Sequence, residues 1–193
     1  MTWLIAGLIV FLGAHSVRIF AEDWRRAQIA KLGLGAYKGI YAVVSALGLV
    51  LIVIGYGQAR GAAIVIWDPP LWARHVSALL VLFAFVLLAA AYVPRNHIKA
   101  AVGHPMILGV KIWAFGHLLA NGHLEDLLLF GGFLAWAVFD YRAARRRDRS
   151  QGRAGVRGTL AGDVTTIVVG AGAWAVFALY LHGWLIGVRP FVI

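Results

Sequence analysis

The sequence predicts an all-α fold, a polytopic membrane helix bundle with about six transmembrane helices. Hydrophobic residues make up 62% of the chain, charged residues make up only 13%, and the mean hydropathy is +0.82. Soluble domains are roughly 45–50% apolar and about 25% charged, so a soluble domain of this length would expose much apolar surface to water. The apolar residues gather in stretches of span length, and basic residues alternate between the loops. At this length we expect one domain covering residues 1–193.

Each expected span is an apolar stretch bounded by charged or turn-forming residues. A transmembrane helix needs roughly 20 apolar residues. Pro94 ends the third span because proline cannot continue a helix. The fourth span is slightly short for a full crossing. The expected spans are residues 3–24, 37–57, 71–93, 105–120, 124–141 and 164–187.

The distribution of basic residues predicts the orientation of the bundle. Lysine and arginine are enriched in cytoplasmic loops. The odd-numbered loops hold 14 of the 18 basic residues, whereas the fourth loop has none and is followed by Glu125 and Asp126. We therefore expect a bacterial inner-membrane protein with both termini in the periplasm. The basic residues of the odd-numbered loops are Arg18, Arg25, Arg26, Lys31, Lys38, Arg95, Lys99, Arg142, Arg145, Arg146, Arg147, Arg149, Arg153 and Arg157.

A reporter enzyme fused after Ile193 is therefore expected to be active in the periplasm. The measurement is the activity ratio of a periplasmic and a cytoplasmic reporter, each fused at this position. Cytoplasmic activity would contradict the orientation.

Composition also limits the chemistry and the partners. The chain has no cysteine, which excludes disulfides, thiolate metal sites and cysteine nucleophiles. The net charge of +10 comes largely from the segment 142–157. Its position between two apolar spans indicates a topogenic loop that contacts anionic lipid head groups, and we expect no nucleic-acid partner. Small residues predict close helix packing at Gly48, Gly55, Gly170, Gly172 and Ala173.

Two of the seven histidines lie well inside apolar spans. His15 belongs to the first span and His117 to the fourth, and each follows a small residue that would leave room for a flat cofactor. Ionisable groups at membrane depth are costly and usually face a cavity or a ligand. Spacing alone leaves open whether each histidine binds a metal or simply bonds to a backbone carbonyl. Surface or interfacial positions are expected for His75, His97, His123 and His182. His104 lies at the start of the fourth span.

The depths of the two histidines decide whether one cofactor could reach both. If the first span ends at Trp24, His15 lies about 14 Å from the cytoplasmic interface, and His117 lies about 18 Å from it, at ~1.5 Å per residue. If the span ends at Arg18 instead, the depths differ by about 14 Å. The expectation that the two histidines face each other therefore depends on the end of the first span.

Other ionisable residues lie on the same spans as the two candidate histidines. Arg18 lies three residues after His15 and therefore on the same helix face. His104 precedes Pro105 at the start of the fourth span, and Lys111 follows seven residues later on nearly the same stripe. We expect His104 and Lys111 to form a polar face that binds an anion or a carboxylate.

Several sequence features together resemble the NnrU family. They are Gly13-Ala14-His15-Ser16, Trp67-Asp68-Pro69-Pro70 with Trp72, Arg74 and His75, the stretch from His104-Pro105-Met106 through Trp113, His117-Leu118-Leu119 and Asn121-Gly122, and residues 130–137. The family is named for a denitrification gene cluster. It also includes the plant and cyanobacterial 15-cis-zeta-carotene isomerase, a haem-binding membrane enzyme.

The resemblance implies that His15 and His117 ligate the iron of haem b. From their charge and position, we expect Arg18, Lys111 and His104 to be available to the propionates of such a haem. In the isomerase a cysteine lies three residues before the second histidine, and this chain has Ala114 there. The resemblance therefore implies a haem site but not the isomerase mechanism, and no catalytic residue can be assigned.

Three functions remain open. The first is an NnrU-type haem b protein linked to nitrogen-oxide respiration, with a quinone or a redox protein as partner. The second is a haem-dependent isomerase acting on a carotenoid or another isoprenoid lipid. The third is a transporter or structural membrane factor without a cofactor, in which the face of His104 and Lys111 lines a polar path.

Overall fold

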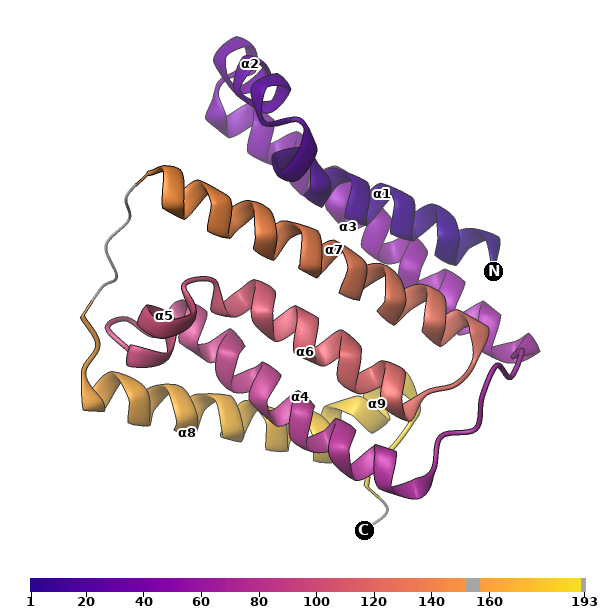
Figure 1. The fold of residues 1–193 in the computed structure, drawn as a ribbon. Helices are drawn as coiled ribbons and strands as arrows, with labels where there is room; N and C mark the ends of the chain where they lie inside the picture. The colour runs from indigo at the N-terminus through magenta and orange to yellow at the C-terminus, as the bar shows by residue number, and fades with distance from the viewer. Residues whose placement is uncertain (152–156, 192–193) are drawn as a thin grey trace. The chain divides into compact units, whose positions relative to one another are not determined.

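The computed structural model describes residues 1–151 and 157–191, and these residues are almost entirely helical (Figure 1). The all-α prediction is confirmed, and about six transmembrane helices fit the structure. Five helical segments are long and apolar enough to cross a membrane, and α6 is a shorter apolar helix. The elements are α1 (Thr2–Phe20), α2 (Glu22–Leu32), α3 (Leu34–Ala59), η1 (Arg60–Ala62), α4 (Leu71–Tyr92), α5 (His97–Val102), α6 (Pro105–Ala120), α7 (Leu124–Ser150), α8 (Leu160–Val176), η2 (Phe177–Leu181) and α9 (His182–Ile186).

The described residues form two compact units. Unit 1 contains Met1–Asp68 and Gly122–Asp140, and unit 2 contains Pro69–Asn121 and Tyr141–Ile193. Each unit is therefore assembled from two separate parts of the sequence.

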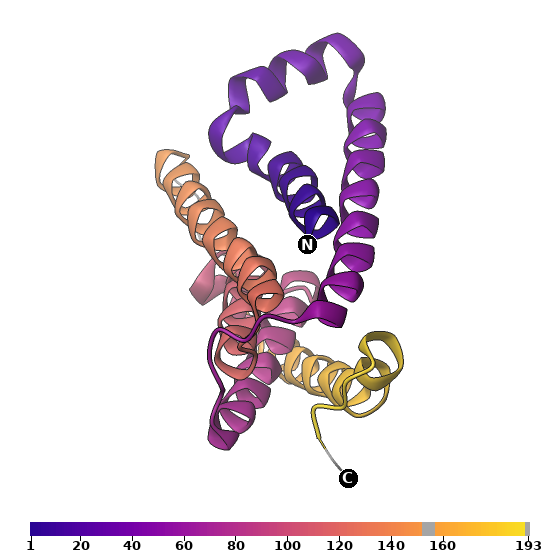
Figure 2. The same ribbon diagram turned by 90° about the vertical axis from the view of Figure 1, so that its right-hand side faces the viewer.

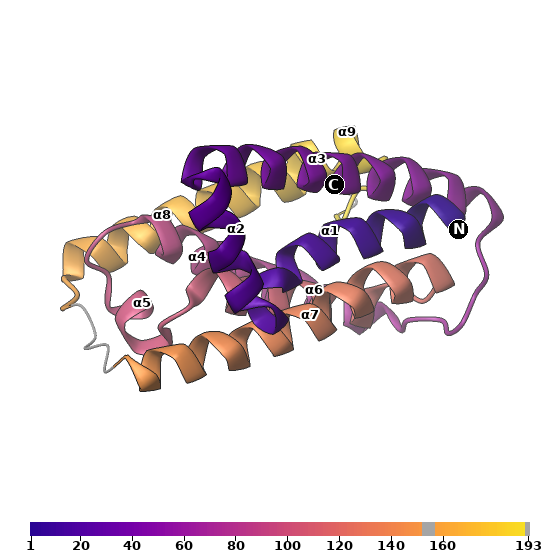
Figure 3. The same ribbon diagram turned by 90° about the horizontal axis from the view of Figure 1, so that it is seen from above.

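In unit 1, α1 and α3 lie side by side because glycine removes the side chains between them (Figures 1 and 3). A Cβ on Gly48 would lie 2.7 Å from the backbone nitrogen of Phe11, and a Cβ on Gly55 would overlap the backbone of Leu4. Leu4 and Ile52 are buried in the core of this pair. The helix α2 forms the turn between them (Figure 2). The prediction that Gly48 and Gly55 are packing positions is confirmed.

The first part of α7 adds a third helix to unit 1. The rings of Phe11 and Phe133 are 5.7 Å apart, and a Cβ on Gly132 would contact Leu12. The chain entering α7 is paired with the segment that leaves α3, since Val65 and His123 form an isolated antiparallel bridge. The helices α1, α3 and α7 thus surround one set of side chains.

In unit 2, α4 packs against both α6 and α8. A Cβ on Gly109 would lie 3.0 Å from the carbonyl oxygen of Ala84, and one on Gly170 would lie 2.6 Å from the Cα of Val86. The packing prediction is confirmed for Gly170. It is wrong for Gly172, where a Cβ would meet nothing within 4 Å, and Ala173 is exposed.

Two expected span boundaries need correction. The helix α1 ends at Phe20, and Trp24 belongs to the separate helix α2. Glu22 and Asp23 occupy the first turn of α2, where acidic side chains interact favourably with the helix dipole. The fifth span was expected to end at residue 141, but α7 continues to Ser150. Most of the expected basic loop is therefore helix, and Arg153 lies outside the described residues.

The sixth apolar segment is also continuous but irregular. It begins at Thr159, whose side chain caps α8, and passes through the π-helical turn η2 into α9. The helical stretch thus runs over residues 160–186, close to the expected 164–187.

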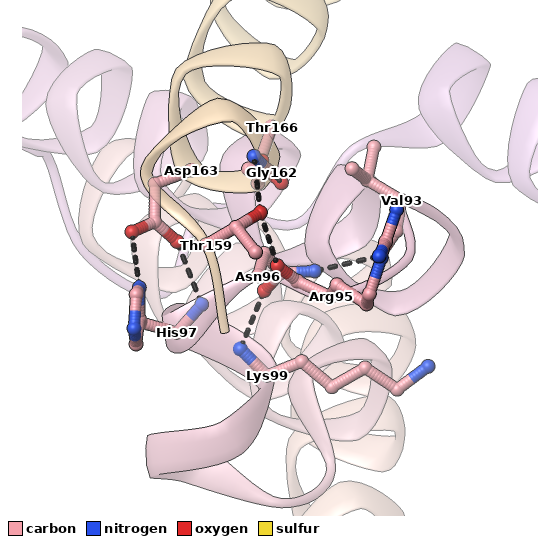
Figure 4. A network of polar contacts seen from close by, with 9 residues as sticks. All are labelled: Val93, Arg95, Asn96, His97, Lys99, Thr159, Gly162, Asp163 and Thr166. Atoms are coloured by element: carbon pink, nitrogen blue, oxygen red, sulfur yellow. Dashed lines mark hydrogen bonds and ion pairs between the residues drawn. The ribbon is translucent and has the colours of Figure 1, made fainter. Parts of the chain in front are cut away.

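A network of polar contacts joins the α4–α5 turn to the start of α8 (Figure 4). The backbone N–H of His97 donates to Oδ1 of Asp163, and its Nδ1 lies 2.7 Å from Oδ2 of the same carboxylate. Thr159 donates two hydrogen bonds, from its N–H and its hydroxyl, to the carbonyl of Arg95. The buried Asn96 caps α5 by accepting from the N–H of Lys99.

Replacing Asp163 by alanine is expected to lower the thermal unfolding temperature, because two hydrogen bonds to a charged group are lost. The measurement is thermal unfolding of the detergent-purified protein. Asp23→Ala is the control, because the Asp23 side chain is 98% exposed. Equal unfolding temperatures for the two variants would contradict the proposed contribution.

Candidate cofactor site

His15 is held on α1 in an orientation suited to binding a metal. Its Nδ1 lies 2.7 Å from the carbonyl oxygen of Phe11, one helical turn earlier. Because a carbonyl can only accept, Nδ1 carries the proton and the lone pair is on Nε2. Histidine ligands of metals usually have this arrangement, in which the second nitrogen donates to a carbonyl or a carboxylate.

Aromatic side chains from three helices surround the His15 ring. Phe11 stacks on it at 4.2 Å with an interplanar angle of 27°. Tyr41 of α3 lies 5.2 Å away, and Trp136 of α7 lies 5.9 Å away with its plane at 90°. These rings restrict the imidazole and give it apolar surroundings, which are the conditions under which a protein tunes a bound metal.

His117 has the same local arrangement on α6. Its Nδ1 lies 2.9 Å from the carbonyl oxygen of Trp113, which again places the lone pair on Nε2. The Trp113 ring lies 5.1 Å from the imidazole. Asn121 donates from its side chain to the carbonyl oxygen of His117 at 2.8 Å and so holds the end of the helix. Ala114, at the position of the isomerase cysteine, is fully buried.

The two histidines belong to different compact units, His15 to unit 1 and His117 to unit 2. That they face each other and share one cofactor stays a prediction. The depth estimate favoured a shared cofactor only if the first span ended at Trp24, but α1 ends at Phe20. His15 lies five residues, or about 7.5 Å, before that helix end.

The expected polar face of α6 is present in part. His104 lies 2.7 Å from Oδ2 of Asp148, a carboxylate of the same chain, and both side chains are largely buried. Lys111 is half-buried, and its binding of an external anion stays a prediction. Arg18 is exposed near the end of α1, and its role toward a propionate is likewise untested.

The remaining histidines lie mostly at the surface, as expected. His75 is exposed, and the side chain of His97 is 62% exposed although it pairs with Asp163. The side chain of His123 is 45% exposed, and Nδ1 of His182 lies 2.7 Å from the carbonyl oxygen of Val188. Within the described ranges, no group of three metal-ligating side chains comes together.

Two groups of polar side chains were missed from the sequence. The first consists of Ser45 and Trp136, whose polar atoms are buried in unit 1. The second consists of the carboxylates Glu125 and Asp126, which follow the fourth loop in the sequence and are buried in the first turn of α7. Tyr56 donates to Oδ1 of Asp126 at 2.6 Å. The polar character of these residues within or beside apolar spans was the available signal, but their partners on other helices could not be identified from the sequence.

By its fold, this chain is a multi-pass helical membrane protein with a histidine held in a metal-ligand orientation on each of two apolar helices. The profile of the family described as NnrU protein matches residues 3–190. The chain belongs to the NnrU family. No curated protein and no solved structure matches it.

Proposed function

We propose that this chain is a haem b protein of the bacterial inner membrane, in which His15 and His117 are the axial ligands of the iron. One observation supports the proposal: in both histidines Nδ1 lies within hydrogen-bond distance of the carbonyl oxygen four residues earlier, the arrangement in which Nε2 is the nitrogen that would ligate a metal. Partly buried histidines that bind no metal are common in proteins, but the same arrangement at both positions favours a common role as metal ligands.

The residues present fit a haem. Neutral imidazoles are common axial ligands, and the surroundings of the site set the potential of the iron. When bound, the haem would supply one-electron redox chemistry. The chain's own contribution would be to orient the imidazoles and to exclude water through the rings of Phe11, Tyr41, Trp113 and Trp136.

We further propose that the redox function serves nitrogen-oxide respiration, with a quinone or a redox protein as electron partner. Membership of the NnrU family supports this part of the proposal. Ala114 does not provide the thiol found at the corresponding position of the isomerase, so isomerisation of a carotenoid or another isoprenoid is the less favoured alternative.

The test is the absorption spectrum of the detergent-purified full chain, recorded oxidised and reduced. A Soret band with sharpened bands on reduction is expected for a haem with two imidazole ligands. A protein that stays colourless after expression with ample haem would overturn the proposal and favour a transporter or structural factor. Conversion of an added polyene by the haem-loaded protein would favour the isomerase alternative.

A further inference from the structure

The carboxylate of Glu125, in the first turn of α7, receives no hydrogen bond from any residue that the structure describes. The residue is 0% exposed, and both of its carboxylate oxygens are buried without a hydrogen-bond partner. A buried ionised carboxylate that no donor contacts is very costly, whereas the neutral carboxyl group is much less so. Burial without donors therefore favours the form of Glu125 that carries a proton.

The next residue, Asp126, is also buried but has a donor on each of its oxygens. The Tyr56 hydroxyl of α3 donates to Oδ1 at 2.6 Å, and the backbone N–H of His123 donates to Oδ2 at 3.2 Å. Hydrogen bonds that are donated to a carboxylate favour its ionised form. The two neighbouring acids thus have opposite surroundings, and a negative charge is better placed on Asp126 than on Glu125.

The His123 imidazole lies beside both carboxylates and also reaches the surface. Its Nδ1 is 3.9 Å from Oε1 of Glu125 and 3.5 Å from Oδ2 of Asp126, and its side chain is 45% exposed. The backbone of His123 is held in place by its antiparallel bridge to Val65. Histidine is the side chain that gains and loses a proton most readily between pH 5 and 8. This ring therefore connects the two buried acids of unit 1 to water outside the loop between α6 and α7.

The donor set decides between a proton and a metal ion as the cation that these acids bind. Among residues 1–151 and 157–191, no three metal-ligating side chains come together. A proton needs neither a cavity nor several ligands. When two carboxylates share a buried site, a second negative charge is strongly disfavoured and one of them binds a proton. The other ionisable groups at this site are Tyr56 and Arg60, whose positive charge acts on Tyr56.

We propose that Glu125 is a proton-binding residue that exchanges its proton with water through His123. The step moves one proton and no electrons. The O–H bond of the Glu125 carboxyl group breaks, an N–H bond forms at Nδ1 of the imidazole, and the imidazolium releases a proton to water; uptake is the reverse. Because 3.9 Å is longer than a hydrogen bond, the exposed ring of His123 has to move closer to Glu125 for each transfer. The inference is independent of the proposed haem.

The test is infrared spectroscopy of the detergent-purified full chain at neutral pH, where a protonated carboxyl group gives a C=O stretching band that carboxylates lack. The chain has only eight acidic residues, and exposed carboxyl groups are ionised at this pH. The wild type is expected to show one such band, which shifts in deuterated water. Glu125→Gln is expected to remove the band. Glu22→Gln makes the same change at a glutamate that is paired with Arg25, and is expected to leave the band unchanged.

The rate at which the band shifts after rapid mixing with deuterated water tests the role of His123. His123→Gln is expected to keep the band and to slow its shift at least about tenfold, because an amide cannot accept and release the proton as an imidazole does. His75→Gln removes an exposed histidine and is expected to exchange at the rate of the wild type. If Glu125→Gln fails to fold, Glu125→Asp keeps a carboxyl group and is expected to move the position of the band.

The outcomes are distinct. Absence of the band in the wild type, its persistence in Glu125→Gln, or an unchanged band in Glu125→Asp overturns the assignment of the proton to Glu125. Equal exchange rates in the wild type and in His123→Gln overturn the route through the imidazole. None of these results depends on the Soret band, so a failure of this inference and a failure of the proposed function are read from different spectra.

Discussion

Substituting His15 by alanine is expected to weaken haem binding by more than about 100-fold. Loss of a residue that merely supports a metal ligand typically costs 10–100-fold in affinity, and here the ligand itself is removed. His117→Ala is expected to have an effect of the same order. The measurement is the Soret absorbance per mole of purified protein, with membrane insertion checked by the yield of monodisperse protein in detergent.

Two controls make the result specific. His75→Ala removes an exposed histidine and is expected to leave the spectrum unchanged. His15→Gly with added imidazole is expected to recover part of the absorbance, since free imidazole can occupy the ligand position. Unchanged spectra in both His15→Ala and His117→Ala would rule out these two residues as the ligand pair, and loss in only one would indicate a single protein ligand.

Introducing valine at Gly55 is expected to destabilise unit 1 by at least about 3 kcal/mol. Even the Cβ would overlap the backbone of Leu4, which is fully buried, so α1 and α3 would have to move apart. Overpacking of a side chain in a core costs about 1–3 kcal/mol, and a backbone clash cannot be relieved by a change of rotamer. The measurement is the thermal unfolding temperature and the yield of the purified protein.

The chain offers a matched control for this substitution. Gly57 lies two residues further along α3, and a Cβ there would meet nothing within 4 Å. Gly57→Val therefore makes the same change in helix propensity and hydrophobicity without the clash. Similar unfolding temperatures for the two variants would show that the close approach of α1 and α3 is not required.

The span boundaries could be predicted where the sequence contains strong helix-ending signals. The fourth span matches α6 at both ends, because Pro105 favours the first helical position and Asn121-Gly122 follows the last. The first span was extended too far because Trp24 was interpreted as an interfacial anchor. The acidic pair that begins α2 was the better signal.

The continuation of α7 through the arginines was missed for a different reason. Arginine favours helices almost as strongly as alanine does, so a charged segment need not be a loop. The positive charges also lie at the carboxyl end of the helix, where they interact favourably with its dipole, and the acids Glu125 and Asp126 lie at the amino end.

The two histidines of the candidate site could each be predicted from the sequence, but the residues that surround them from other helices could not. His15 and His117 stand out because each interrupts an apolar span. The aromatic neighbours of His15 on other helices, Tyr41 and Trp136, do not, since aromatic residues occur in membrane helices for many reasons. Their importance follows from the register of α3 and α7 against α1, which depends on contacts between residues far apart in the sequence.

Unit 1 is built from the first 68 residues and from residues 122–140, with the whole of α4 to α6 between them. During biosynthesis, α1 and α3 therefore leave the ribosome well before the helix that completes the surroundings of His15. At about 5–20 residues per second, Trp136 follows several seconds after α3. In that interval the nascent chain must hold the glycine-lined pair of α1 and α3 in the bilayer without its third helix. Any ligand that relies on Trp136 can be captured only after α7 has been synthesised.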